Sequence, residues 1–196
     1  NLLQAMREAN AHGIIFSSSC TTYGIPTIIP IPVSHSQNPI NPYGWSKLMA
    51  EQMIQQIGDV HEIRYSILRY FNAAGADPEG ELREEHNPET HLIPLAVRSA
   101  FDENSPLHIY GTDYPTKDGT CIRDYIHVST LADAHVESLK RLEKGSHSEI
   151  LNLGTGKGFS VKDIVKKIED LTGHKLPIIE SKRRLGDPPI LIAETD

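Results

Sequence analysis

The sequence predicts an α/β protein that contains part of a doubly wound parallel sheet. Two observations carry this prediction: helical and extended patterns alternate over residues 2–68, and residues 14–16 form a short run with no polar position. Alternation of helices and strands is typical of βαβ units. A strand without polar positions is typical of a parallel sheet that is covered on both faces. The 196 residues suffice for one core, or for one and a half domains.

The first part of the chain is expected to supply two helices and two strands. A helical pattern covers residues 2–11, and a second helix begins with Asn41 as its N-cap and Pro42 as its first residue. We expect Gly58 to close this helix and residues 63–68 to form the next strand. The expected buried side of the second helix consists of apolar residues at helical spacing: Leu48, Met49, Met53, Ile54 and Ile57.

The second part of the chain alternates shorter elements. Ser129 is expected to cap a helix that runs to Lys144. Ser160 and Asp163 are expected to form a capping box for a helix that ends at Gly173. The other predicted elements are a helix over residues 92–102 and strands over residues 107–110, 124–128, 150–153, 178–179 and 190–192.

Composition argues against several functional classes. The formal net charge of -7 argues against a nucleic-acid partner. No apolar run approaches the roughly 18–20 residues that span a bilayer, so we expect no membrane association. Cys20 and Cys121 have no paired spacing, and the 10 histidines show no His-x₃-His pattern. These observations predict a cytoplasmic protein without disulfides and without a metal site, and Cys20 has no neighbouring base that would make it a nucleophile.

The beginning and end of the sequence indicate a longer parent protein. The first residue is Asn1 rather than Met, and the helical pattern is already in progress there. The sequence shows no pattern of a signal peptide. We therefore expect the chain to be a piece of a protein that extends further at both ends.

Tyr43 and Lys47 are the first candidates for chemistry. They stand four residues apart at the start of a helix, which places them on one face, one turn apart. A nearby ammonium favours the phenolate form of a tyrosine. Ser17, Ser18 and Ser19 follow the apolar strand, and ligands of open α/β sheets bind at the carboxyl ends of strands. A Tyr-x₃-Lys pair is common by chance, but the serine run makes a catalytic site the better interpretation.

Longer segments extend this pattern along almost the whole chain. They are Ser17–Ser19, Pro42–Lys47, Leu68–Ala76, His91–Pro94, Ile109–Thr120, Arg123–Val128, Asn152–Gly154 and Arg183–Pro188. With them, the sequence resembles the extended short-chain dehydrogenase/reductase family and, within it, the UDP-hexose 4-epimerases. Residues 109–128 are the most discriminating part, because short-chain dehydrogenases in general do not carry this block.

The resemblance implies a Rossmann-type NAD-binding domain and a smaller α/β domain for the substrate. The NAD-binding part would comprise residues 1–72 and 122–148, and the substrate-binding part residues 73–121 and 149–196. The family's glycine-rich turn for the NAD pyrophosphate is absent from the sequence and is expected before Asn1. We therefore expect the isolated chain to be inactive, and the full-length parent to be a homodimer.

The implied reaction is NAD-dependent epimerisation at C4 of a UDP-hexose. It would interconvert UDP-glucose and UDP-galactose through a transient 4-keto intermediate. By the resemblance, Tyr43 takes the proton from the sugar 4-hydroxyl, Lys47 favours the phenolate and binds the nicotinamide ribose, and Ser19 bridges to the sugar hydroxyl. Ser17 and Phe71 complete the implied cofactor-binding set, with Phe71 holding the orientation of the nicotinamide.

The implied substrate-binding residues fall mainly on later segments. They are Asn72, His91, Leu92, His108, Ile109, Tyr110, Arg123, Arg184, Asp187 and Leu191, together with Ser19 and Tyr43. Residues 108–110 match the strand that holds uracil, and Asp187 would take the ribose hydroxyls. Arg123 and Arg184 would clamp the diphosphate, because the planar fork of arginine suits it. Two such cations allow an acidic protein to bind a dianion.

Alternatives remain open for the substrate. Leu191 stands where side-chain size gates N-acetylated sugars in relatives, so a 4-epimerase for UDP-N-acetylglucosamine or a UDP-pentose stays an alternative. A sugar-nucleotide 4,6-dehydratase would require carboxylates directly after the serine run, where residues 20–22 are Cys-Thr-Thr. A non-catalytic module on this fold would be expected to have lost Tyr43 or Lys47. Arg69, inside a predicted strand, is expected to be a structural ion-pair residue.

Overall fold

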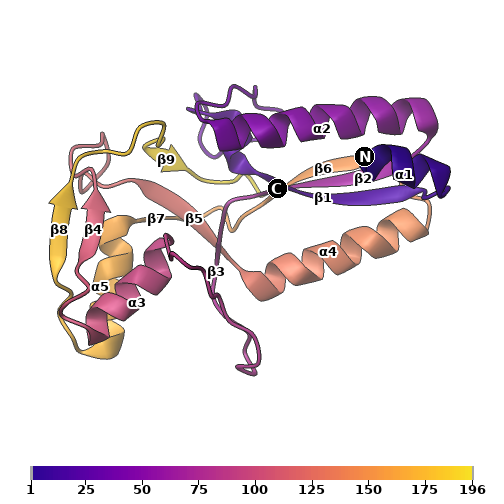
Figure 1. Ribbon diagram of the computed structural model, residues 1–196. Coiled ribbons are helices and arrows are strands. Elements are labelled where there is room, and N and C mark those ends of the chain that lie inside the picture. The colour runs from indigo at the N-terminus through magenta and orange to yellow at the C-terminus, as the bar shows by residue number, and fades with distance from the viewer. Residues whose placement is uncertain (1, 196) are drawn as a thin grey trace.

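The computed structural model describes residues 2–195, so Asn1 and Asp196, the outermost residues of the two predicted domains, lie outside the described residues. Its elements are α1 (Leu2–Glu8), β1 (Gly13–Ser19), the 3₁₀ turn η1 (Cys20–Tyr23), α2 (Pro42–His61), β2 (Arg64–Tyr70), β3 (Asn72–Ala74), α3 (Leu92–Phe101), β4 (Leu107–Tyr110), β5 (Ile122–His127), α4 (Val128–Glu143), β6 (Glu149–Leu153), β7 (Gly158–Ser160), α5 (Val161–Thr172), β8 (Ile178–Ser181) and β9 (Ile190–Leu191). Figure 1 shows them in two lobes, with β3, β5 and β7 between the lobes.

The first sheet is parallel and has the strand order β1-β2-β6. α2 packs on one face of this sheet and α4 on the other (Figure 1). Both faces are therefore covered, which accounts for the apolar residues 14–16 in β1. Ile54 of α2 packs with Tyr65 and Ile67 of β2 in the core between them. The parallel β1–α2–β2 unit confirms the predicted α/β class with part of a doubly wound sheet.

β5 is the centre of a second sheet. It pairs in parallel with β3 and β9 and antiparallel with β7. The sequence predicts neither β3 nor β7, because strands of three residues are too short to carry a periodic pattern. Only Phe71 separates β2 from β3, so the second sheet begins where the first one ends. The division of the chain into two domains at the predicted boundaries stays a prediction.

The strands β4 and β8 pair in parallel and lie beside α3 and α5 (Figure 1). Their shared core contains Leu107 and Ile109 from β4, Ala96 from α3, and Val165 and Ile168 from α5. The alternation of buried and exposed residues along β4 is that of a strand with one face on a core. This small α/β unit matches the second part of the predicted fold class.

Several predicted helix ends are confirmed. Asn41 is the N-cap of α2, where its Oδ1 accepts a hydrogen bond from the backbone N–H of Gly44 at 2.8 Å, and Pro42 is the first helical residue. Ser160 and Asp163 form the predicted capping box at the start of α5. Gly173 ends that helix with a φ of 73°, a value that glycine adopts without strain.

The predicted end of α2 is wrong. The helix continues past Gly58 to His61, and Glu62 turns the chain with a φ of 56°. Gly58 is a packing position instead: a Cβ added there would lie 2.7 Å from the carbonyl oxygen of Ile63. Its missing side chain lets the segment that enters β2 approach the helix backbone.

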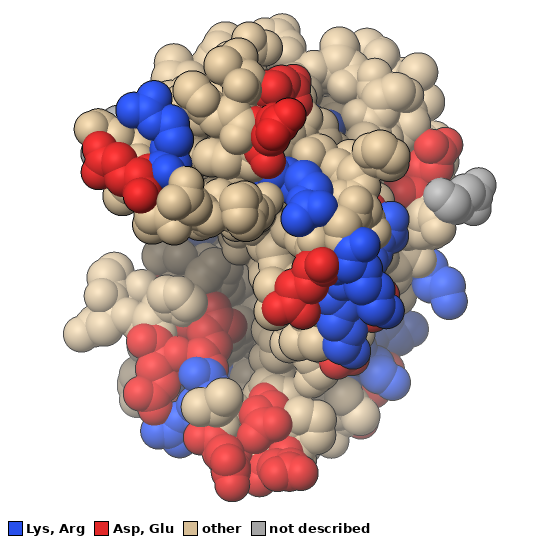
Figure 2. Space-filling view, turned by 90° about the vertical axis from the view of Figure 1, so that its right-hand side faces the viewer, with Lys and Arg blue, Asp and Glu red and all other residues tan. Residues whose placement is uncertain are grey.

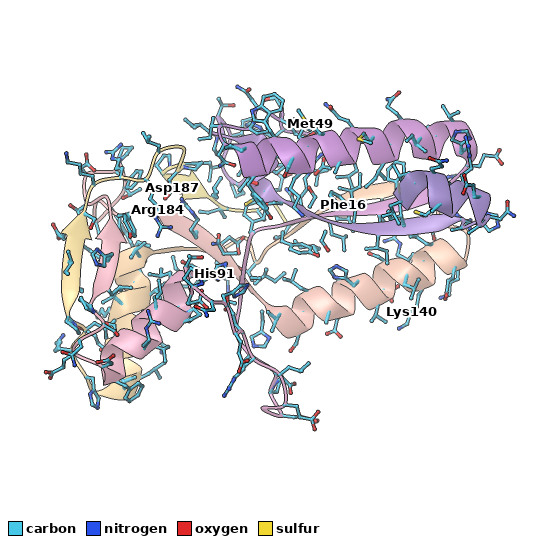
Figure 3. The ribbon with its side chains drawn as sticks, in the orientation of Figure 1. Phe16, Met49, His91, Lys140, Arg184 and Asp187 are labelled. Atoms are coloured by element: carbon cyan, nitrogen blue, oxygen red, sulfur yellow. The ribbon has the colours of Figure 1, made fainter. Side chains whose placement is uncertain are left out.

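The predicted buried side of α2 is wrong in part. Leu48 and Ile54 are buried, but Met49 and Met53 are more than half exposed. Met49 lies on the outer side of the helix, away from the sheet (Figure 3). The stripe that faces the sheet instead includes Glu51, which lies between Leu48 and Ile54 at helical spacing and is fully buried. A pattern of hydrophobicity does not find a charged residue in such a stripe.

Two boundaries near the strand ends also differ from the prediction. The N-cap of α4 is His127 rather than Ser129, and the His127 ring accepts a hydrogen bond from the backbone N–H of Ser129 at 3.2 Å. Histidine is not among the preferred capping residues, so the sequence favours the serine. β1 extends through Ser19, which places the serine run inside the strand rather than after it.

The surface carries both signs of charge. On the face shown in Figure 2, acidic and basic side chains are interspersed and are not gathered into one basic surface. This distribution agrees with the net charge of -7. Among residues 2–195, no helix is both long and apolar enough to cross a bilayer.

A buried ion pair joins α2 to the first sheet. Arg69 in β2 and Glu51 in α2 are 3% and 0% exposed, and Nη2 of the arginine lies 2.7 Å from Oε2 of the carboxylate. Ser18 also donates a hydrogen bond to Glu51, as does Gln37 at 2.9 Å. Arg69 also donates to the hydroxyl of Tyr23 at 2.9 Å. The prediction that Arg69 is a structural ion-pair residue is confirmed.

Arg69→Met is expected to lower the free energy of unfolding by about 3–5 kcal/mol, because Glu51 then stays buried without a counter-charge. The double variant Glu51→Met/Arg69→Met is expected to recover most of this loss, since no buried charge remains. Urea denaturation of both variants measures the two values.

Arg141→Met is the matched control for this prediction. It removes the ion pair with Glu149 at 2.9 Å, in which the arginine side chain is 50% exposed. Such a pair is worth about 1 kcal/mol or less. An equal loss in Arg141→Met, or a double variant as unstable as Arg69→Met, would contradict the assignment.

Candidate active site

The carboxyl ends of β1 and β2 meet at one edge of the first sheet. In the parallel register Ser19, the last residue of β1, lies beside Tyr70, the last residue of β2. Phe71 and Asn72 follow directly, and the first turn of α2 begins above the same edge (Figure 1). Because ligands of such sheets bind outside the carboxyl ends of the strands, this edge is where a site is expected.

Tyr43 and Lys47 come together at this edge. Both lie in the first two turns of α2, and Lys47 Nζ is 5.6 Å from the centre of the Tyr43 ring. The ammonium donates a hydrogen bond of 2.9 Å to the backbone oxygen of Ser17, which fixes it over the end of β1. The Tyr43 side chain is 55% exposed and so is accessible to a ligand.

The hydroxyl of Ser19 can make one further hydrogen bond, as a donor. Its Oγ accepts hydrogen bonds from the backbone N–H of Thr21 at 3.2 Å and from the Thr21 hydroxyl at 3.0 Å. A serine hydroxyl has two acceptor positions and one proton to donate. With both acceptor positions engaged by Thr21, Ser19 is left as a hydrogen-bond donor.

A large cleft opens in front of these residues. Its volume is about 820 Å³, and it lies between the edge of the first sheet, the start of α4 and the loop that follows β3. The predicted site residues in its lining are Ser19, Tyr43, Phe71, Asn72 and His91. Lys47 and Ser17 lie outside this lining and contact each other through the Lys47 ammonium. The structure thus brings the predicted catalytic and cofactor-binding residues to one place.

A second cleft of about 410 Å³ lies against the small α/β unit. The predicted substrate-binding residues in its lining are Asn72, Leu92, His108, Ile109, Tyr110, Arg123, Arg184 and Asp187. Arg184 and Asp187 lie near one another on the segment before β9 (Figure 3). Because Asn72 lines both clefts, the two clefts adjoin each other at this residue.

The predicted charged residues of the second cleft, Arg123, Arg184 and Asp187, differ in their partners. Arg123 is 8% exposed and forms an ion pair with Asp187, and it also donates to the backbone oxygen of Ile122 at 2.8 Å. Arg184 stacks on the ring of Tyr110, with its Cζ 4.0 Å from the ring centre. Arg184 therefore has its guanidinium positioned at the cleft without a carboxylate to neutralise it among the described residues.

Leu191 is placed differently from the other predicted site residues. Its side chain is 3% exposed and packs in a core cluster with Phe71 and Cys20. It lies in β9, where it pairs with Arg123 of β5. Leu191 therefore lies beside residues of both clefts but does not line either one.

The sequence misses two polar residues at the edge of the sheet. The hydroxyl of Tyr70 contacts both the Ser17 hydroxyl and His135 Nε2, the latter at 2.8 Å. His135 Nδ1 lies 2.7 Å from the backbone oxygen of Leu131. Burial raises the pKa of Tyr70, so its hydroxyl stays neutral. The available signal was the position of His135 on the same helix face as Leu131 and Ser138, which are buried.

The fold and the site together define a class of protein. A parallel sheet with helices on both faces and with polar side chains at its carboxyl edge is typical of doubly wound nucleotide-binding enzymes. The sequence model of the NAD dependent epimerase/dehydratase family matches residues 1–154. The chain belongs to this family.

Individual relatives are similar over the entire chain. A UDP-glucose 4-epimerase of Rhizobium leguminosarum bv. trifolii is 47% identical over 195 residues, which are 100% of this chain and 60% of that protein. The crystal structure of UDP-glucose 4-epimerase from Brucella ovis in complex with NAD is 51% identical with a TM-score of 0.93, over 98% of this chain and 59% of that one. The enzyme from Bifidobacterium longum in complex with NAD⁺ and UDP is 38% identical with a TM-score of 0.91, over 99% and 58%. The chain spans about 60% of the length of the curated relatives it matches.

Cys20, next to Ser19, is a buried thiol. It is 4% exposed, and burial raises the pKa of its thiol to about 12. A thiol with so high a pKa carries almost no thiolate near neutral pH. The prediction that Cys20 is not a nucleophile therefore agrees with its surroundings.

A thiol reagent is expected to leave Cys20 unmodified in the folded protein at about pH 9, and to modify both cysteines after unfolding. Because the folded pKa lies above the unfolded one, the folded state holds the proton more tightly. The contribution of this thiol to the free energy of unfolding therefore decreases as the pH rises from about 9 towards about 12. Mass spectrometry of the labelled peptides, before and after unfolding, measures the modification; rapid labelling of folded Cys20 would show that the thiol is accessible and ionised.

Proposed function

We propose that the protein encoded by the complete reading frame is an NAD-dependent 4-epimerase of a UDP-hexose, interconverting UDP-glucose and UDP-galactose. The observation that carries the proposal is the pair of adjoining clefts. One is lined by Ser19 and Tyr43, with Lys47 next to Tyr43, and the other is lined by Arg184. A sugar nucleotide also has two parts: the sugar that reacts would occupy the first cleft, and the charged nucleotide would bind in the second. The names and bound ligands of the similar proteins from Brucella and Bifidobacterium support the same assignment.

The proton chemistry at the sugar falls to Tyr43. Its exposed phenol lines the cleft, with the ring centre 5.6 Å from Lys47 Nζ, and would accept a proton from the sugar 4-hydroxyl as the general base. Ser19 would donate a hydrogen bond to the same sugar oxygen, because its hydroxyl hydrogen is not engaged by Thr21. Loss of this proton to Tyr43 and of the hydride from C4 would leave a 4-keto sugar. Return of the hydride to the opposite face of C4, together with the proton from Tyr43, would give the epimer.

The cofactor-binding set is Ser17, Ser19, Tyr43, Lys47 and Phe71. These residues lie together at the carboxyl edge of a parallel sheet, in or behind a cleft of about 820 Å³, so they fit the nicotinamide end of NAD. Bound there, NAD supplies the hydride acceptor and donor for C4 of the sugar. Lys47, whose ammonium donates to the backbone oxygen of Ser17, would bind the nicotinamide ribose. Phe71, which is buried and lines the cleft, would hold the orientation of the nicotinamide.

The nucleotide falls to the second cleft. Arg184, stacked on Tyr110, offers its guanidinium to the diphosphate, and residues 108–110 lie where uracil would bind. Arg123 and Asp187 are paired with each other in this structure. Their proposed roles on the diphosphate and the ribose therefore require this pair to separate. Asn72 lines both clefts, His91 lines the larger one and Leu92 the smaller one, so these residues would contact the sugar or the diphosphate.

Homodimerisation and a cytoplasmic location complete the proposal. The outer side of α2 carries exposed apolar side chains at Trp45, Met49, Met53 and Val60. Such a row on a helix is typical of a surface that another subunit covers. The two free cysteines agree with a reducing compartment.

Tyr43→Phe in the product of the complete reading frame is expected to lower kcat for UDP-galactose by about 10²–10⁴-fold, since the general base is lost. Tyr65→Phe, which removes a phenol bonded to Asp59 away from the cleft, is the matched control and is expected to keep its activity. A coupled assay with UDP-galactose and UDP-N-acetylgalactosamine measures both and identifies the accepted sugar. Full activity of Tyr43→Phe would refute the assignment, as would a different product from both sugars.

Arg184→Ala in the 196-residue chain is expected to weaken UDP binding by about tenfold or more, because a hydrogen bond to a charged group is worth about 1.5–3 kcal/mol. Arg183→Ala is the neighbouring control, since Arg183 pairs with Asp113 instead of facing the cleft. Isothermal titration with UDP measures both constants and does not depend on NAD. Equal weakening in both variants would place the diphosphate elsewhere.

A further inference from the structure

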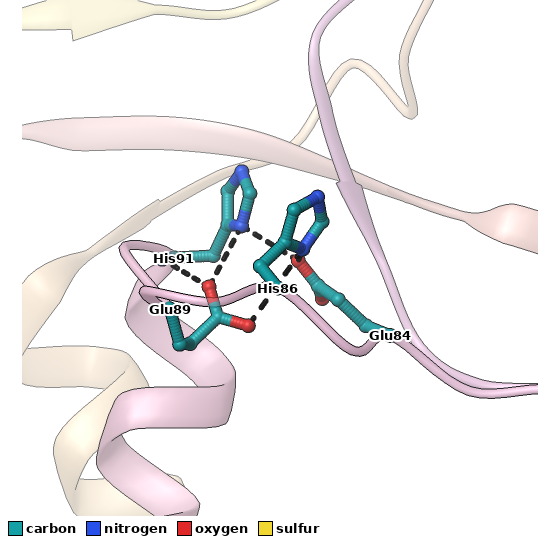
Figure 4. Close-up of side chains that lie close together, drawn as sticks. All are labelled: Glu84, His86, Glu89 and His91. Carbon is teal, nitrogen blue, oxygen red and sulfur yellow. Dashed lines mark hydrogen bonds and ion pairs between the residues drawn. The ribbon is translucent and has the colours of Figure 1, made fainter.

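Four metal-ligating side chains converge in the segment between β3 and α3. They are Glu84, His86, Glu89 and His91, shown in Figure 4. The Nδ1 atom of His91 lies 2.6 Å from Oε1 of Glu84 and 2.9 Å from Oε1 of Glu89. The Nδ1 atom of His86 lies 3.0 Å from Oε1 of Glu84 and 3.8 Å from Oε2 of Glu89. Four ligand atoms, one from each residue, all lie within 4.8 Å of one another.

Each histidine ring in the cluster faces more carboxylates than its Nδ1 atom has protons to donate. Each Nδ1 carries at most one proton, yet each faces the carboxylates of both Glu84 and Glu89. No lysine or arginine among the described residues is paired with either carboxylate. Arg83, the nearest arginine in sequence, pairs with Glu85 instead. Two carboxylates with neutral imidazoles carry a charge that one divalent cation would balance.

We propose that Glu84, His86, Glu89 and His91 bind one divalent transition-metal ion, with Zn²⁺ as the best match. Two imidazole nitrogens and two carboxylate oxygens form a set of four ligands that suits tetrahedral Zn²⁺. With bonds of about 2.1 Å, ligand atoms of a tetrahedral site lie about 3.4 Å apart. The distances between the ligand atoms in the cluster range from 2.6 Å to at most 4.8 Å and so lie on both sides of that value. Small rotations of the side chains would therefore bring the four atoms to bonding distance of one ion. Mg²⁺ and Ca²⁺ prefer oxygen ligands and fit a site with two imidazoles poorly.

Part of the site is held in place by the backbone. The Glu89 carboxylate accepts hydrogen bonds from the backbone N–H groups of Thr90 at 2.6 Å and of His91 at 2.7 Å, and its side chain is 10% exposed. His91 is the N-cap residue of α3 but makes no side-chain capping bond, so its ring is available as a ligand. The two rings lie with their centres 4.9 Å apart.

The metal would tie the loop to the first turn of α3. Glu84 and His86 come from the loop, whereas Glu89 and His91 directly precede the helix. Glu84, His86 and His91 line the larger cleft, and Glu89 lines the smaller one. The ion would therefore fix the segment that forms a wall of both clefts. This inference stands on these four residues and does not require the proposed epimerisation.

The sequence gives little sign of this site. The two histidines are separated by four residues in a loop, and the glutamates lie among other acidic residues, Glu81 and Glu85. The prediction of no metal site rested on the absence of a His-x₃-His pattern, which applies to ligands on a helix. The proposal departs from that prediction.

The test is a metal titration of the protein without an affinity tag, after treatment with a chelator. Addition of Co²⁺ is expected to produce the intense visible absorption of a tetrahedral site, to saturate at about one ion per chain, and to disappear when Zn²⁺ replaces Co²⁺. Zn²⁺ is also expected to raise the unfolding temperature, because it binds the folded state. Mg²⁺ at the same concentration is expected to do neither.

His86→Ala and Glu84→Gln are the test variants, and His147→Ala is the matched control. His147 is exposed and lies outside the cluster. Both test variants are expected to lose the tetrahedral spectrum and the rise in unfolding temperature, while their circular dichroism stays that of the wild type. The control is expected to keep both signals. The proposal is overturned if Co²⁺ keeps the weak spectrum of the hydrated ion, or if all three variants bind the metal equally.

Discussion

The buried pair of Glu51 and Arg69 determines how α2 sits on the first sheet. The carboxylate comes from the middle of the helix and the guanidinium from the last part of β2, so the pair joins the two elements at one point. Ser18 and Tyr23 contact the same pair and bring in the end of β1 and the turn that follows it. Because both charges are removed from water, neither can move without leaving the other unpaired. The relative positions of Ser19 on β1 and of Tyr43 on α2 follow from this constraint.

Much of the fold could be predicted where a local signal is strong. Two helix starts are predicted by interactions within a few residues: the N-cap Asn41 followed by Pro42, and the capping box of Ser160 and Asp163. Gly58 misled the prediction because its role is a contact with Ile63, which depends on how the chain folds back. Met49 and Met53 misled it because the buried stripe of α2 includes Glu51, and burial of a carboxylate depends on a partner in another element.

The site shows the same division between local and distant causes. Tyr43 and Lys47 are one turn apart on a helix, and Ser19 ends a strand, so their approach follows from rules for helices and parallel sheets. The polar contacts of Tyr70 with His135 join residues from β2 and α4. The spacing of His135 from Leu131 and Ser138 indicates which face of α4 it occupies, but not that Tyr70 lies opposite, because that contact depends on how the helix packs against the sheet. The convergence of Glu84 with His91 likewise depends on the path of a loop.

The two hydrogen bonds from Thr21 to Ser19 orient the Ser19 hydroxyl at the carboxyl edge of the first sheet. A hydroxyl group on a ligand can give its proton away or receive one, and in water it does both without preference. Beside Ser19 the choice is removed, because this serine can no longer receive. A ligand hydroxyl that contacts Ser19 must offer a lone pair there and turn its own hydrogen elsewhere, towards the exposed phenol of Tyr43. In the proposed reaction, Thr21 would thereby set the direction in which the proton of the sugar hydroxyl leaves.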